Sequence, residues 1–161
     1  MKIVLVIPYR GIGDLIFHIP LIKGLSLRYN TKINIITNKV NKAKNLLKNQ
    51  RSIKNIEYIN FKRENQIKNS YLFYKKINSF NSDICILTAP TKRLVIPLIM
   101  SNAKNKIYFK KDNTKDLSKY IIKQSKIELK NIKFIDDYSL NFNQNKKKKK
   151  NIFISIDSRH D

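Results

Sequence analysis

The residues with the clearest chemical potential lie at positions 8–14, where Gly11 and Gly13 are followed directly by Asp14. Glycines can adopt positive φ angles, so this segment predicts a tight turn that ends at a carboxylate. A carboxylate at the edge of a cleft can take a proton from a sugar hydroxyl, which makes Asp14 a candidate general base. Asp is also a preferred helix N-cap, and this structural role is the alternative interpretation. In that position, N–H donors and the helix dipole would hold the pKa of Asp14 down.

The spacing of these glycines does not match the common nucleotide-binding signatures. Ile16 occupies the third glycine position of the dinucleotide fingerprint, and no Gly-Lys-Ser/Thr follows to form a P-loop. The spacing alone is therefore weak evidence for nucleotide binding.

The sequence predicts neither a metal site nor a cofactor. The single cysteine, Cys85, lies in the apolar run at 84–87 and is predicted to be an inert core residue. His18 and His160 have no ligand-like spacing to Cys85 or to each other. Because one cysteine cannot form an intrachain disulfide, we expect a reducing compartment.

Apolar runs alternate with helical patterns along the chain. Strands are predicted at 3–7, 32–37, 56–61, 83–88 and 106–109. Helices are predicted at 14–29, 40–50, 67–80, 94–100 and from Leu117 onward. This alternation predicts an α/β fold, a Rossmann-like parallel sheet with helices on both faces. The two all-apolar strands, 3–7 and 84–87, should be adjacent and central, which gives the order 3-2-1-4-5. Residues 11–14 and 88–93 would then face each other across a cleft.

The chain is predicted to contain one domain and the start of another. Residues 1–145 form the N-terminal domain, and the Lys-rich segment 146–151 is interpreted as a linker. An apolar strand at 152–156 is followed at once by a polar turn. Residues 152–161 therefore look like the opening of a second α/β unit.

The net charge of +23, from 34 basic and 11 acidic residues, allows two interpretations. One is an anionic partner, such as nucleic acid, membrane lipid or a phosphorylated substrate. The other is a compositional bias that overuses Lys, Asn and Ile together. The lysine block at 146–150 lies between folded segments, which favours a linker over a nucleic-acid tail. No segment approaches the roughly 20 apolar residues of a membrane span, and the N-terminus does not match a signal peptide. We therefore expect a cytoplasmic protein that can rest on the inner membrane surface.

The first twenty residues resemble the start of the family 9 glycosyltransferases, the bacterial heptosyltransferases of lipopolysaccharide core assembly. The matching pattern is an apolar strand, a short loop, Gly13-Asp14, a few apolar residues and then Pro20. Residues 152–161 resemble, over a short stretch, the family's strand and its Thr-Thr-Arg-Asp-Asp sequence, without the lysine that would follow. The middle of the chain fits the family only in the order of its elements.

This resemblance implies a GT-B fold, which has two facing Rossmann-like domains and needs no metal. The N-terminal domain holds a glycolipid acceptor, and the C-terminal domain binds a nucleotide sugar, typically ADP-heptose. Asp14 falls on the family's catalytic aspartate, and Ser158 falls on the hydroxyl that contacts the donor phosphate. Arg10, Gly11 and Gly13 lie in the loop that flanks the acceptor.

Two further features are assigned to packing rather than to binding. His18 stands where the family more often has a small or hydroxylated residue, and we expect it to serve local packing. Tyr71, Phe73 and Tyr74 form an aromatic cluster on the helix at 67–80, for which core packing is favoured over a sugar or membrane contact.

The leading functional hypothesis is the acceptor-binding half of a heptosyltransferase-like glycosyltransferase, truncated or split and inactive alone. A nucleotide-sugar donor would bind only with a C-terminal donor domain. Lys92 and Arg93, after the fourth strand, are candidates for binding acceptor phosphates or carboxylates, with solvated loop charges as the alternative. The alternative function is a non-enzymatic basic Rossmann-like module that binds anionic lipid or nucleic acid.

Overall fold

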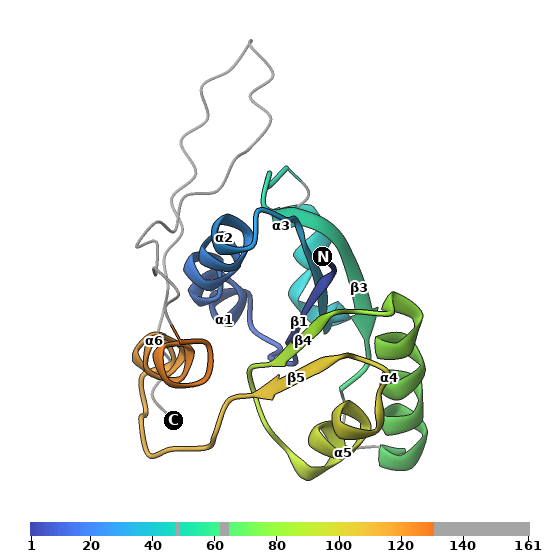
Figure 1. The fold of residues 1–161 in the computed structure, drawn as a ribbon. Helices are drawn as coiled ribbons and strands as arrows, with labels where there is room; N and C mark the ends of the chain where they lie inside the picture. The colour runs from blue at the N-terminus through green and yellow to red at the C-terminus, as the bar shows by residue number, and fades with distance from the viewer. Residues whose placement is uncertain (48, 62–64, 131–161) are drawn as a thin grey trace.

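The sheet has five parallel strands, and its strand order is the one that the sequence predicts. A computed structural model describes residues 1–47, 49–61 and 65–130. The sheet order is β3-β2-β1-β4-β5 (Figure 1). The strands are β1 (Ile3–Ile7), β2 (Ile33–Asn38), β3 (Ile53–Ile59), β4 (Ile84–Leu87) and β5 (Asn105–Tyr108). All residues of β1 and β4 are buried, as expected for central strands of a parallel sheet. The α/β, Rossmann-like fold is thus confirmed.

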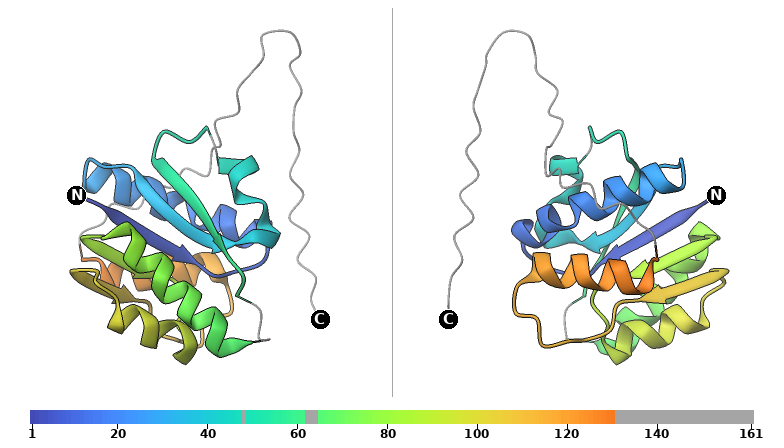
Figure 2. Two further views of the ribbon diagram at one scale, coloured as in Figure 1. Left: turned by 90° about the vertical axis from the view of Figure 1, so that its right-hand side faces the viewer. Right: turned by 60° about the vertical axis from the view of Figure 1, so that its left-hand side comes forward.

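Helices cover both faces of the sheet. They are α1 (Ile12–Phe17), α2 (Ile19–Arg28), α3 (Ala43–Leu47), α4 (Gln66–Phe80), α5 (Lys92–Met100) and α6 (Leu117–Glu128), with a 3₁₀ turn at Lys39–Asn41. Figure 2 shows α4 and α5 in front of the sheet in its left view, and α2 and α6 on the opposite side in its right view.

The alternation of side chains along β1 explains the two cores. Ile3, Leu5 and Ile7 pack into one apolar cluster with residues of α1, α2, α3 and α6. Val4 and Val6 point the other way and pack with residues of α4 and α5. Because β1 has branched apolar side chains on both sides, it holds the two helical layers together.

The predicted helix at 14–29 is in fact two helices, and it begins earlier than expected. Gly11 is the N-cap of α1, with extended φ and ψ of −76° and 148°, so Asp14 is the third helical residue and not the cap. The break at His18 follows from Pro20 in the first turn of α2, because proline has no N–H to continue the helical hydrogen bonds. The expected positive φ at the glycines is wrong too, since no glycine in the described ranges has one.

The predicted helix at 40–50 is also shorter than expected. The left-handed backbone of Lys42, with a φ of 49°, separates the 3₁₀ turn from α3. The linker at 146–151, the segment 152–161 and Ser158 lie outside the described residues. Within the ranges that the structure describes, no helix is long and apolar enough to cross a membrane.

Candidate functional site

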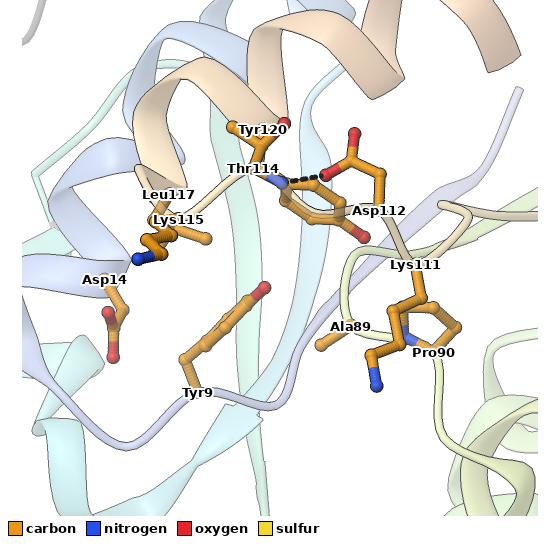
Figure 3. Close-up of a pocket in the computed structure, with 10 residues that line it drawn as sticks. All are labelled: Tyr9, Asp14, Ala89, Pro90, Lys111, Asp112, Thr114, Lys115, Leu117 and Tyr120. Atoms are coloured by element: carbon orange, nitrogen blue, oxygen red, sulfur yellow. Dashed lines mark hydrogen bonds between the residues drawn. The ribbon is translucent and has the colours of Figure 1, made fainter.

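A cavity of about 400 Å³ opens at the carboxyl ends of β1, β4 and β5 (Figure 3). Its lining comes from the loops after these three strands and from the first turns of α1 and α6. The lining residues are Tyr9, Asp14, Ala89, Pro90, Lys111, Asp112, Thr114, Lys115, Leu117 and Tyr120. Parallel strands end at the same edge of a sheet, so segments about 100 residues apart in sequence meet there.

Asp14 is the candidate base in this cavity. Its carboxylate Oδ2 accepts a hydrogen bond from the Gly11 N–H at 3.0 Å, which holds the side chain back across the first turn of α1. The side chain is half-buried, and this burial raises the pKa of Asp14 above its ordinary value despite the opposing hydrogen bond from Gly11. The expectation of a lowered pKa is therefore wrong, because loss of solvent outweighs one N–H donor. A raised pKa makes the carboxylate a better proton acceptor.

Gly11 is a glycine because of Asp14 and not because of its own backbone angles. A Cβ atom at position 11 would lie 2.7 Å from Oδ2 and 3.3 Å from Cγ of Asp14. No side chain at position 11 can coexist with the carboxylate in its present place. The pair Gly11 and Asp14 is thus one geometric unit.

We expect Gly11→Ala and Gly11→Ser to impair a reaction that depends on Asp14 without unfolding the protein. The new Cβ displaces the carboxylate from the Gly11 N–H, and a displacement of about 1 Å in a reacting group can cost about 10²-fold in rate. Serine is a good N-cap, so the Gly11→Ser protein should keep its thermal stability. The rate of that reaction and the thermal denaturation of both variants measure the two effects. An undiminished rate in both would show that the carboxylate position does not matter.

The His18 side chain connects the backbone of Asp14 to Thr88, the residue that follows β4. It is fully buried, and burial lowers the pKa of its imidazole to about 4. The neutral ring donates from Nδ1 to the Asp14 carbonyl oxygen at 2.6 Å. Its Nε2 lies 3.0 Å from Oγ1 of Thr88, a hydroxyl that can donate its one proton either to this nitrogen or to the Val6 carbonyl oxygen at 3.1 Å. The packing role expected for His18 is confirmed, and it connects two residues that lie 74 positions apart (14 and 88).

The loop between β5 and α6 was missed by sequence reasoning. Asp112 in this loop accepts hydrogen bonds from Thr114 N–H at 2.8 Å and Gln124 Nε2 at 3.2 Å, and it pairs with Lys123 at 3.1 Å. These contacts, the Thr114 N–H first, lower the pKa of Asp112 to about 2. Asp112 is therefore an ionised anchor of the loop on α6. The signal that could have revealed this loop is its place after the fifth strand, at the same sheet edge as Asp14.

The loop also brings two lysines to the cavity. Lys111 and Lys115 are exposed, and within the described part of the chain neither forms an ion pair. The half-buried Tyr9 and the buried Tyr120 complete the wall: burial raises the pKa of Tyr9 above its ordinary range and that of Tyr120 to about 12. Both phenols keep their protons at neutral pH, and the Tyr120 hydroxyl donates to the Thr88 carbonyl oxygen at 3.5 Å. The cavity thus combines one carboxylate with raised pKa, two ammonium groups and two neutral hydroxyls.

The other predicted site residues lie around this cavity without lining it. Arg10 is exposed beside Gly11, and Gly13 is inside α1. Lys92 is exposed at the start of α5, two residues after Pro90 of the cavity. Arg93 donates from its guanidinium to the Phe61 carbonyl oxygen at 3.0 Å, so it connects α5 to the segment after β3. The acceptor-binding roles expected for these four residues, and for Gly11, stay predictions.

Side chains arranged as a metal site were not found in the ranges that the structure describes: no three His, Cys, Asp or Glu residues lie together there.

Comparison with known proteins supports the fold. No model of a protein family matches the sequence, and no curated protein matches it. The structure is similar to the crystal structure of the glycosyl transferase family 9 protein from Veillonella parvula DSM 2008, with a TM-score of 0.62 and 18% sequence identity. The match covers 86% of this chain and 42% of that one. The chain therefore spans less than half the length of that protein, and at this identity the likeness concerns the fold.

Proposed function

We propose that the chain is the acceptor-binding half of a glycosyltransferase, and that Asp14 is its general base. The observation that carries this proposal is a half-buried carboxylate of raised pKa, held by Gly11 and His18 at a cavity on the carboxyl edge of the sheet. The fold shared with a family 9 protein and the sequence resemblance of residues 1–20 support the same assignment.

The proposed reaction uses Asp14 in one step. Its carboxylate takes the proton of an acceptor hydroxyl while that oxygen forms a bond to the anomeric carbon of the donor sugar. The bond between the anomeric carbon and the diphosphate oxygen breaks, and the nucleotide diphosphate leaves with the electron pair. Groups of a donor-binding domain would stabilise the charge of the leaving group. The resemblance indicates an ADP-heptose-like donor, and the chemistry written here needs no metal.

The charges around the cavity fit an acidic acceptor. Lys111 lies beside Pro90 and Lys115 lies nearer Asp14, so two ammonium groups line different sides of the cavity, where they suit carboxylate or phosphate groups of a sugar (Figure 3). Tyr9 adds a neutral hydroxyl that can donate to a sugar oxygen, and the Tyr120 oxygen, whose proton goes to the Thr88 carbonyl, can accept from a sugar hydroxyl. An acceptor of the lipopolysaccharide core, which carries acidic sugars and phosphates, has this chemistry.

The test is sugar transfer from ADP-heptose to a truncated lipopolysaccharide core. We expect little or no product from the 161-residue chain alone, since the groups that bind the donor are proposed to lie in another domain. Product should form when a separately expressed donor-binding half of a family 9 enzyme is added. Full transfer by the isolated chain would refute the division into halves. No transfer with any donor half, together with no binding of the acceptor to the isolated chain, would refute the assignment itself.

A further inference from the structure

Helices α4 and α5 form one continuous outer layer on their side of the sheet. Ser70 Oγ of α4 donates to the Arg93 carbonyl of α5 at 3.0 Å, and the Asn102 N–H donates to Asn78 Oδ1 at 2.8 Å. The two helices therefore run side by side in the same direction (Figures 1 and 2). Each turns its buried residues toward the sheet, so their opposite sides share one outer surface.

This outer surface carries large apolar side chains in solvent. Their exposed fractions are 89% for Ile67, 54% for Tyr71, 46% for Leu72, 56% for Ile96, 54% for Ile99 and 66% for Met100. Single exposed apolar residues are ordinary, but a group of this size on two adjacent helices marks a binding surface. We call these six residues, with Lys68, Lys75 and Lys92, the α4–α5 face.

The charge on the α4–α5 face has a single sign. Neither α4 nor α5 contains an aspartate or a glutamate. Lys68, Lys75 and Lys92 are exposed, and the Lys75 ammonium lies 4.8 Å from the centre of the Tyr71 ring. Among the described residues, Lys68 and Lys92 form no ion pair. The face therefore presents unneutralised positive charge beside protruding apolar groups.

We propose that the α4–α5 face docks on the surface of an anionic lipid bilayer. Apolar side chains that enter the boundary between headgroups and acyl chains, with lysines at the level of the phosphates, are the arrangement that binds such a surface. A second copy of this chain is a poorer occupant, because a symmetric contact would bring the same unpaired lysines together. Nucleic acid would attract the lysines but would leave the isoleucines without a partner.

The α4–α5 face also lies close in sequence to residues that line the cavity. Helix α5 begins two residues after Pro90, and both helices begin after strands that end at the cavity edge of the sheet. The docking proposal itself does not depend on sugar transfer, and the experiment below uses no donor or acceptor.

The test is co-sedimentation of the full chain with vesicles of phosphatidylcholine containing phosphatidylglycerol, against vesicles of phosphatidylcholine alone. The double variant Lys68→Gln/Lys92→Gln should lower the partition coefficient about 25-fold, at about fivefold for each lysine. Ile96→Ser/Ile99→Ser should lower it about fivefold or more through lost apolar burial. All four positions are exposed, so folding should be unaffected. Binding should also weaken as salt is raised.

Matched controls lie on the opposite side of the sheet. Lys119→Gln/Lys126→Gln on α6 removes the same charge, and Leu27→Ser/Ile127→Ser removes apolar groups that are 67% and 52% exposed. Both control proteins should bind within about threefold of the wild type, because their substitutions lie more than a Debye length from a bilayer docked at α4 and α5. An equal loss in variants and controls would overturn the proposal, since adsorption would then follow overall charge. The proposal would also be overturned if the wild-type chain stayed in the supernatant. It would be overturned as well if light scattering showed that the wild type self-associates and that Ile96→Ser/Ile99→Ser abolishes this, because the face would then bind a second copy of the chain.

Discussion

Replacing Asp14 with asparagine should lower sugar transfer about 10²- to 10⁴-fold, the usual contribution of a general base. The amide oxygen of asparagine can still accept the Gly11 N–H, so the first turn of α1 should keep its geometry. The amide cannot take a proton from the acceptor. The measurement is the transfer rate of the chain combined with a donor-binding half, alongside circular dichroism and thermal denaturation of the variant.

A matched control is Asp83→Asn, which removes a carboxylate at the other end of the sheet. Asp83 accepts the Lys2 N–H at 2.8 Å and pairs with Lys104 at 2.8 Å, at the start of β4 and away from the cavity. This variant should keep its transfer rate and lose at most a small amount of stability, because the pair is exposed. A transfer rate in Asp14→Asn within about tenfold of the wild type would contradict the base assignment.

The pH dependence of the wild type gives a second readout of the same residue. In the proposed reaction Asp14 acts as a base only when it is ionised, so transfer should rise with pH as this carboxyl loses its proton. Since burial raises the pKa of Asp14, the rise should be centred above the ordinary value of 3.8. Gly11→Ala, which moves the carboxylate, should shift the centre of this rise.

The strand order could be predicted because the two central strands report their burial in their sequence, whereas β2 is equally buried but carries the polar Asn34, Thr37 and Asn38. Runs such as Ile3–Ile7 and Ile84–Leu87 have no polar residue, so they had to be central, and the right-handed crossover rule then placed the others. The break between α1 and α2 could have been predicted from Pro20, since only the missing N–H interrupts an otherwise apolar helical pattern.

The site could be predicted only in part, because the burial of Asp14 and the position of the loop after β5 depend on contacts between residues far apart in sequence. Asp14 was found from local spacing together with the resemblance of residues 1–20 to family 9, since spacing alone favoured a helix cap. Its raised pKa could not be, because burial by residues of other loops is not visible in the segment 8–14. The lysines of the loop after β5 were missed for the same reason: nothing in their local sequence distinguishes them among 34 basic residues. Their position becomes informative only once β5 is known to lie beside β4.

The free energy of unfolding should fall by about 3 kcal/mol between pH 6.5 and pH 4 because of His18. In the unfolded chain this imidazole takes a proton near pH 6.5, whereas burial in the folded protein lowers its pKa to about 4. Between these values the unfolded state binds more protons, so stability is fully present above pH 6.5 and is lost as the pH falls. Chemical denaturation at a series of pH values measures the change.

The variant His18→Gln isolates the contribution of His18 to the pH dependence of stability. Glutamine has no titratable ring, and every other titratable group of the protein is unchanged. Its stability should be lower at pH 7, by about 2–4 kcal/mol, since the Thr88 hydroxyl and the Asp14 carbonyl lose well-placed partners and the side chain is smaller. The difference between wild type and variant should shrink as the pH falls toward 4. Carboxylates such as Asp112, whose pKa is about 2, titrate equally in both proteins and cancel in the difference.

NMR titration of the His18 ring in the wild type gives an independent value of its pKa. A pKa near 6.5 would show that the ring is not buried between Asp14 and Thr88. A protonated ring would donate from Nε2 to Thr88 Oγ1, whose hydroxyl can donate to the Val6 carbonyl oxygen at 3.1 Å, and Nδ1 would keep its bond to the Asp14 carbonyl. The loss of stability should therefore come from burying the charge, with the Asp14 backbone staying in place.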